Sequence, residues 1–244
     1  MRNIRIIAKR EIVGYFITPL AYIFIVIFLA LIGAFTFYIG RFFTNGQASL
    51  ESFFAYHPWL YLILVPAVAM RLWAEERKTG TIELLMTLPL SLFQVVVGKY
   101  LAAVIFTAIS LALTFPLWIT VNYLGEPDNG AILAGYFGSL LMAGGFIAVG
   151  AFISALTKNQ VVAFVMTAAA CFVLIASGAP IVLSFFAGWA PKAAVDFIAS
   201  LSFLAHFTDI SKGVLDLRDV VYFVSLIVAF LFANAIAVER LKAE

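Results

Sequence analysis

Residues 20–39 read LAYIFIVIFLALIGAFTFYI, and this stretch decides the class of fold. It contains no charged side chain, and a helix of about 20 apolar residues is long enough to cross a bilayer. Inside lipid every backbone polar group needs an internal partner, so spanning segments are helices or closed barrels. A barrel strand would alternate polar and apolar residues, which this run does not do. The stretch therefore predicts a transmembrane helix.

The composition extends this prediction to the whole chain. Of the 244 residues, 64% are hydrophobic and 11% are charged, and the mean hydropathy is +1.09. Soluble domains carry about 25% charged residues. The net charge of +2 is too small to indicate nucleic-acid binding, and the single Cys171 cannot form an intrachain disulfide or a multi-cysteine metal site. We predict an all-α integral membrane protein.

Apolar segments comparable to residues 20–39 recur along the chain, bounded by polar, Gly or Pro residues. We therefore predict one transmembrane domain over residues 1–244 with six spans. The predicted spans are 20–40, 53–73, 93–121, 131–156, 161–183 and 220–238. In the fourth span Gly135, Ser139 and Ala143 recur every four residues, a spacing that allows close helix packing.

Residues 1–17 precede the first span and mix apolar side chains with basic ones. The basic residues are Arg2, Arg5, Lys9 and Arg10. This pattern predicts an amphipathic helix in the membrane interface, where basic side chains favour the anionic cytoplasmic leaflet. A secretory signal peptide would have a shorter apolar run followed by a small-residue cleavage pattern, so we expect a retained first span.

The distribution of Lys and Arg predicts the orientation of the spans. If the N-terminus is cytoplasmic, eleven of the fifteen basic residues fall on the cytoplasmic side. The other four are Arg41, Lys192, Lys212 and Arg218. Because cytoplasmic loops carry the excess of basic residues, we predict that both termini are cytoplasmic. Arg71 and Lys99 fall near cytoplasmic span ends, where we expect their long side chains to extend into water.

The segment 181–213 is apolar but interrupted. Pro180 and Pro191 break it, and Lys192 and Asp196 add charges to its second half. Neither half reaches a full membrane thickness, so we predict a re-entrant or interfacial helix pair on the outer side instead of a seventh span.

The loop after the second span, residues 74–91, reads AEERKTGTIELLMTLPLS and is too patterned for a simple connector. Gly80 and Pro89 bound a short helix that is apolar on nearly every face. An apolar helix outside the bilayer needs a cover, and a hydrophobic groove on a cytoplasmic partner would supply one. The alternative is that this helix lies in the membrane interface.

The order and spacing of residues 75–89, EERKTGTIELLMTLP, followed by VGKYL at 97–101, resemble the signature region of ABC-2 type transporter permeases. In that family the loop forms the coupling helix that docks on the ATP-binding subunit. The resemblance therefore implies an ATPase-coupling role for Glu75, Glu76, Gly80, Thr81, Glu83, Leu84, Leu85 and Met86. Residues 201–223 are similar to the gliding-motility (GldF-like) branch and to permeases of copper-enzyme maturation (NosY-like).

The resemblance implies a permease subunit of an ATP-driven ABC exporter in the bacterial plasma membrane. Its expected partners are an ABC ATPase, a second permease copy in a homo- or heterodimer, and an extracytoplasmic accessory protein. The sequence contains no GxxxxGK[ST] phosphate loop, so ATP and Mg would be bound by the partner ATPase. We expect no catalytic, cofactor or metal site in this chain, and no enzyme activity of its own.

The charged residues of the second motif permit two interpretations. His206 and Asp209 are spaced so that a helix could present both to a metal, but two ligands without a third make a weak site. A salt-bridged helix start that includes Asp216, Arg218 and Asp219 is the preferred interpretation.

Two other function classes remain as alternatives. A nucleotide-independent secondary transporter or channel predicts buried ionisable groups or an inverted repeat, and the predicted spans show neither. A structural membrane anchor of a multiprotein assembly would leave the apolar loop helix with a partner that is not an ATPase.

Overall fold

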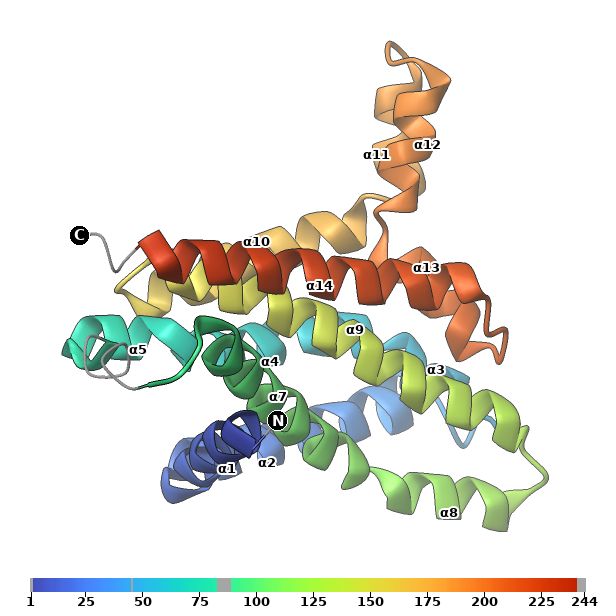
Figure 1. Cartoon of the computed structure of the whole chain (residues 1–244). Helices are drawn as coiled ribbons and strands as arrows, with labels where there is room; N and C mark the ends of the chain where they lie inside the picture. Colours follow the sequence, from blue (N-terminus) through green and yellow to red (C-terminus); the bar gives the residue numbers. More distant parts are fainter. Residues whose placement is uncertain (1, 45, 83–88, 241–244) are drawn as a thin grey trace.

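The computed structural model describes residues 2–44, 46–82 and 89–240. Every regular element within these ranges is a helix (Figure 1). The all-α class predicted from the composition is therefore confirmed for the described part of the chain.

Four helical stretches are long and apolar enough to cross a membrane, and they coincide with the first, third, fourth and sixth predicted spans. The first joins α2 (Pro19–Ala34) to the π-helical η1 (Phe35–Ile39). The second joins α7 (Leu92–Ala112) to α8 (Phe115–Leu124). The others are the single helices α9 (Asn129–Leu156) and α14 (Leu217–Arg240).

The region of the second predicted span is divided among three helices. They are α3 (Glu51–Ala55), α4 (His57–Ala69) and α5 (Arg71–Thr79). Pro58 at the second position of α4 suits a helix start, because its missing N–H would have no intrahelical partner there. This span is therefore an assembly of short helices, which the hydropathy pattern did not indicate.

The region of the fifth predicted span is bent. The helix α10 (Gln160–Ala176) meets α11 (Pro180–Ala187) at 74°. In the segment 181–213, which we predicted to be re-entrant or interfacial, α12 (Lys192–Ser200) meets α13 (Phe203–Ser211) at 57°. If each bent pair counts as one span, the described residues contain up to six candidate spans. These candidates include α12 with α13 and do not include the region of the second predicted span, so they are not the same set as the six predicted spans. The predicted six-span layout stays a prediction.

The long helix α9 is the centre of the packing and contacts α14, α10, α4, α13 and α7. Its small residues permit these close approaches. A Cβ atom at Gly138 would lie 2.6 Å from a methyl group of Ile210, and one at Gly150 would lie 2.5 Å from the Cβ of Ala69. Tight packing is the main source of helix association in lipid, where no hydrophobic effect drives it.

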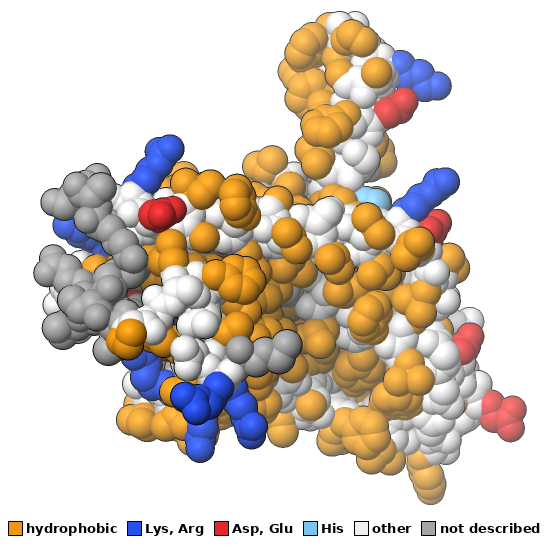
Figure 2. Space-filling view, in the orientation of Figure 1, with side chains coloured by type: hydrophobic (Ala, Val, Ile, Leu, Met, Phe, Trp, Pro, Cys, Tyr) orange, Lys and Arg blue, Asp and Glu red, His pale blue; other side chains and the backbone are white. Residues whose placement is uncertain are grey.

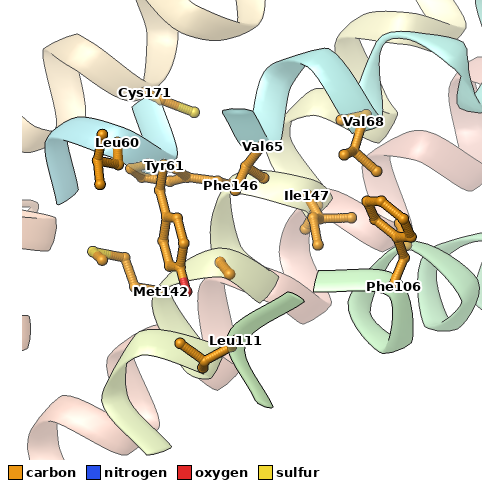
Figure 3. Close-up of a cluster of buried hydrophobic side chains, with 14 of the residues drawn as sticks. Leu60, Tyr61, Val65, Val68, Phe106, Leu111, Met142, Phe146, Ile147 and Cys171 are labelled. Carbon is orange, nitrogen blue, oxygen red and sulfur yellow. The ribbon is translucent and has the colours of Figure 1, made fainter. Parts of the chain in front are cut away.

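Large side chains from several helices fill the space around α9. Figure 3 shows Met142, Phe146 and Ile147 of α9 among the side chains of neighbouring helices. The neighbours drawn there include Leu60, Tyr61, Val65 and Val68 of α4, Phe106 and Leu111 of α7, and Cys171 of α10. The described core is therefore continuous across α4, α7, α9 and α10.

The segment 181–213 divides into two unlike parts. The helices α11 and α12 contain no buried residue and project away from the bundle (Figure 1). The helix α13 instead packs on α9, with Phe203, Phe207 and Ile210 buried. We call α11 and α12, which contact mainly each other, the α11–α12 hairpin.

Candidate functional site

The helix α5 carries the first residues of the predicted coupling loop. Glu75 and Glu76 lie on it, and Gly80 ends it with a φ of +74°, a conformation that favours glycine. The Oγ1 atoms of Thr81 and Thr79 lie 3.0 Å apart beside that end. The remaining predicted coupling residues lie outside the described residues, namely Glu83, Leu84, Leu85 and Met86.

One hydroxyl group fixes the start of α5 to α9. Ser154 Oγ accepts hydrogen bonds from the backbone N–H groups of Trp73 and Ala74 at 3.1 and 3.0 Å. It donates to the carbonyl oxygen of Met70 at 2.8 Å. The first N–H groups of a helix have no partner within the helix, so Ser154 satisfies groups that would otherwise be orphaned.

A second contact ties α5 to the same end of α9. Arg77 Nη1 donates to the carbonyl oxygen of Ala155 at 2.6 Å, where α9 approaches its C-terminus. Carbonyl groups at a helix C-terminus also lack partners and carry partial negative charge, so a guanidinium group is favourable there. With Ser154 and Arg77 in place, α5 cannot shift without displacing the end of α9.

Four charged residues from three helices form a closed ring beside α5. Lys99 Nζ lies 2.8 Å from Glu76 Oε1 and 3.3 Å from Glu11 Oε2. Arg10 Nη2 lies 2.6 Å from Glu11 Oε1 and 3.8 Å from Glu76 Oε1. Positive and negative groups alternate, and we call these four residues the charge ring. It joins α1 (Arg2–Ile17), α5 and α7.

The ring encloses its lysine. The Lys99 side chain is 3% exposed, against 54% for Arg10, and its ammonium group lies 5.3 Å from the ring centroid of Trp73. We expected Lys99 to extend into water, and this prediction is wrong. A buried ammonium group requires paired acceptors, and Glu11 and Glu76 supply them.

The charges of the ring lower the pKa of Glu11 in α1. Burial by itself pushes the pKa of Glu11 upward, but the positive charges of Lys99 and Arg10 outweigh burial. The pKa of Glu11 therefore lies below its ordinary value of 4.5, and the carboxylate form is the stable one.

A cavity of about 200 Å³ borders the charge ring. Its lining includes Glu11, Glu76 and Lys99 of the ring together with Arg71 and Glu75. Arg71 Nε donates to Glu75 Oε2 at 2.9 Å, so a second ion pair lies on the same cavity. The second carboxylate oxygen of Glu76 is buried and has no hydrogen-bond partner among the described residues.

At the opposite end of the bundle His206 connects α13 to α14. Its Nδ1 lies 2.5 Å from Asp219 Oδ1, its Nε2 lies 3.0 Å from the carbonyl oxygen of Ser200, and its ring stacks on Tyr222 at 4.1 Å. Within the described ranges no three potential metal ligands gather. The contact of His206 with Asp219 joins α13 to the start of α14, as the helix-start interpretation expects.

Three members of the charge ring, Arg10, Glu11 and Lys99, were not among the residues predicted for the site, although two signals were visible. Glu11 is the only acidic residue among residues 1–50, and Lys99 is the only charged residue between positions 92 and 124. A lone charge in a long apolar run is costly unless it is paired. The apolar sequence around Lys99 does not predict which residue pairs with it.

The fold and the site define a multi-pass helical membrane protein. Its charge ring lies at the end of the bundle that holds α5. A family model described as ABC-2 family transporter protein matches residues 44–238. The chain therefore belongs to the ABC-2 transporter family, whose members are permease components that work with an ABC ATPase. The comparison with curated proteins finds no match. Arg10 and Glu11 lie outside the matched range.

Proposed function

We propose that this chain is the transmembrane permease subunit of an ATP-driven ABC exporter in a bacterial plasma membrane. A separate ABC ATPase binds ATP and Mg, and two permease copies, or this chain and a relative, pair above two ATPase subunits. The observation that carries the proposal is the attachment of α5. This helix contains the first residues of the predicted coupling loop, and Ser154, Arg77 and the charge ring bind it to the bundle.

Energy transfer follows from this arrangement. Closure of the ATPase dimer on ATP displaces the coupling segment 74–91, and α5 moves with it. Because α5 is bonded to the end of α9, its displacement acts on the helix that packs against most of the bundle. The bundle then exchanges between inward- and outward-facing arrangements, which requires that the ATPase contact each arrangement differently.

The burial of Lys99 bears on the alternative of a nucleotide-independent secondary transporter, because such carriers use buried ionisable groups. Lys99, however, contacts two carboxylates in an alternating ring, and every member of that ring has an opposite charge within 4 Å. A structural arrangement of this kind holds no free charge for an ion to replace. Uptake driven by an ion gradient in ATP-free liposomes would favour the alternative.

The direct test is purification of the full chain from its native membrane in lipid nanodiscs, followed by photolabelling with azido-ATP. The proposal expects a labelled ATPase that co-elutes with the permease. Deletion of Ile82–Met86 should remove the ATPase and leave membrane insertion and abundance unchanged. Recovery of the wild-type permease without a labelled partner overturns the proposal. Equal loss of the protein itself on deletion shows that the loop is only structural.

A further inference from the structure

We propose that Lys99 is the positioning residue through which movement of α5 reaches α1 and α7. This inference rests on the proposed function and extends it. It concerns a lysine outside the coupling loop and an N-terminal helix that contributes half of the charge ring.

The contacts divide the cytoplasmic end into two groups of helices. In the first group, α5 is bonded to α9 through Ser154 and Arg77. In the second, α1 lies directly on α7: a Cβ atom at Gly98 would be 2.8 Å from the side chain of Ile7, and Asn3 Nδ2 donates to Gln94 Oε1 at 3.2 Å. The two groups also pack directly on each other where α7 contacts α9. At α5 itself, the ion pairs of Glu76 with Lys99 and Arg10 connect the first group to the second.

Lys99 has the central place in this connection. It is the ring member on α7, the only helix of the three that belongs to a long candidate span. It contacts α1 through Glu11 and α5 through both Glu76 and the ring of Trp73. A shift of α5 therefore pulls on a buried ammonium group, and α7 must follow or the pair must separate.

Charge makes this contact respond to movement more steeply than an apolar contact would. Buried opposite charges attract strongly when close, and each becomes costly when its partner leaves. Two arrangements are thus favoured over intermediate ones. The bordering cavity supplies room for the second arrangement, because Arg71 and Glu75 line it beside Lys99. Rotation of α5 would offer Lys99 the carboxylate of Glu75 in place of Glu76.

The test uses the purified complex of permease and ATPase in nanodiscs. Spin labels on Lys9→Cys in α1 and Thr79→Cys in α5 report the separation of the two helices with and without ATP. Both positions are exposed, whereas the native Cys171 is buried and does not compete for label. The wild-type ring should give an ATP-dependent change in that separation.

Lys99→Met should abolish the ATP-dependent distance change and lower permease-stimulated ATP hydrolysis about tenfold, while the complex stays assembled. Lys99→Arg, which keeps the charge, should stay within about twofold of wild type. Lys192→Met makes the same substitution at an exposed lysine of the α11–α12 hairpin and should change neither readout. Adding Glu76→Gln to Lys99→Met should cause little further loss, because both changes remove the same contact.

Glu76→Gln alone is the second variant, since Lys99 then keeps Glu11 as a partner and the fold is spared the full cost of an unpaired charge. It should reduce the distance change in the same direction. An unaltered ATP response in assembled Lys99→Met and Glu76→Gln complexes overturns the inference and leaves the proposed function intact. Loss of ATPase binding in parallel with lost thermal stability also overturns it, because Lys99 is then only structural. A wild-type permease that binds no ATPase contradicts the proposed function itself.

Discussion

The end of the bundle that holds the charge ring and the α11–α12 hairpin differ in how their side chains are covered. In the charge ring every charged group has an opposite charge within 4 Å, and bonds connect residues far apart in the sequence. In the hairpin, Phe185 and Trp189 are 68% and 70% exposed and the two helices contact mainly each other. Figure 2 shows hydrophobic side chains over most of the projecting hairpin and charged ones along one side.

The difference arises from the surroundings that each kind of side chain requires. An apolar side chain in lipid needs no protein partner, because lipid tails are as apolar as leucine. A charge away from water needs an opposite charge or a hydrogen bond. A fixed geometry between helices is therefore enforced where charges are buried, and the hairpin lacks that constraint. Substitutions should be costly at the first region and mild at the second.

The largest difference is expected between two lysines given the same substitution. Lys99→Met removes the buried cation that Glu11 and Glu76 share, leaves only the exposed Arg10 between them, and should lower the free energy of unfolding by about 3 kcal/mol. Lys192→Met in the hairpin should change it by less than about 0.5 kcal/mol. Thermal unfolding in one detergent measures both. Similar melting temperatures for the two variants would mean that the ring contributes little to stability.

The pH dependence of stability should differ between the wild-type protein and Lys99→Met. In the wild-type protein the pKa of Glu11 is lowered, so its stabilising effect is present at neutral pH and is lost only as pH falls through that lowered value. In Lys99→Met, Glu11 keeps Arg10 but loses Lys99, so its pKa should be higher than in the wild type. The difference in stability between the two proteins should therefore shrink as pH falls from 7 toward the ordinary value of 4.5. Melting curves at about pH 7 and about pH 5 measure it. Parallel pH profiles would contradict the assigned pairing.

Substitution of two serines compares the same two regions, with smaller expected changes in stability. Ser154→Ala removes the acceptor of two buried N–H groups at the start of α5 and should cost about 2 kcal/mol. Ser184 bonds only to the carbonyl oxygen of Ile181 within α11, so Ser184→Ala should cost less than about 0.5 kcal/mol. Chemical denaturation of the two variants decides between these values, and a reversed order would refute the assigned role of Ser154.

Breaking the contact between His206 and Asp219 should cost an amount of stability between the costs expected at the charge ring and at the hairpin. Asp219 is 6% exposed, and both ring nitrogens of His206 face acceptors. Asp219→Asn should therefore lower stability by about 1 kcal/mol. Asp196→Asn on the exposed side of the hairpin is the control and should have no measurable effect. Thermal melts at neutral pH compare them, and equal values would remove the distinction.

The smallest effect is expected at the hairpin itself. Phe185→Ala should change stability by less than about 0.5 kcal/mol, because that side chain is largely exposed on a helix without buried residues. If the hairpin contacts lipid, Trp189 fluorescence should be quenched by brominated lipids in nanodiscs, in a variant with Trp189 as the sole tryptophan. An unquenched Trp189 would show that protein, not lipid, covers the hairpin.

Much of the fold could be predicted because it depends on local composition. The long apolar runs around α2, α7, α9 and α14 predicted helices that the structure contains. Gly135, Ser139 and Ala143 predicted close packing of α9, and it is seen at Gly135, where a Cβ atom would lie 2.5 Å from the ring of Phe54. The bend of 74° after α10 was less accessible, because Pro180 marks a break without specifying its angle or the elements that pack beside it.

The candidate site was predictable only in part. Pattern and family likeness predicted a coupling region at residues 74–91, and that role stays a prediction. Of its residues, Glu75 and Glu76 lie on α5. Lys99 was expected to reach water, because a lysine near a span end usually can. It does not, because α1 covers it and brings Glu11 within 3.3 Å of its ammonium group.

By itself the sequence determined that the chain is helical and belongs in a membrane, because the preference of a side chain for lipid or water is a property of that side chain. The tertiary structure alone decided which charges meet, since pairing depends on two positions at once. Arg10, Glu11, Glu76 and Lys99 come together only when α1 crosses α7 beside α5. This pairing places Lys99, which looks isolated in the sequence, at the centre of the proposed coupling contacts.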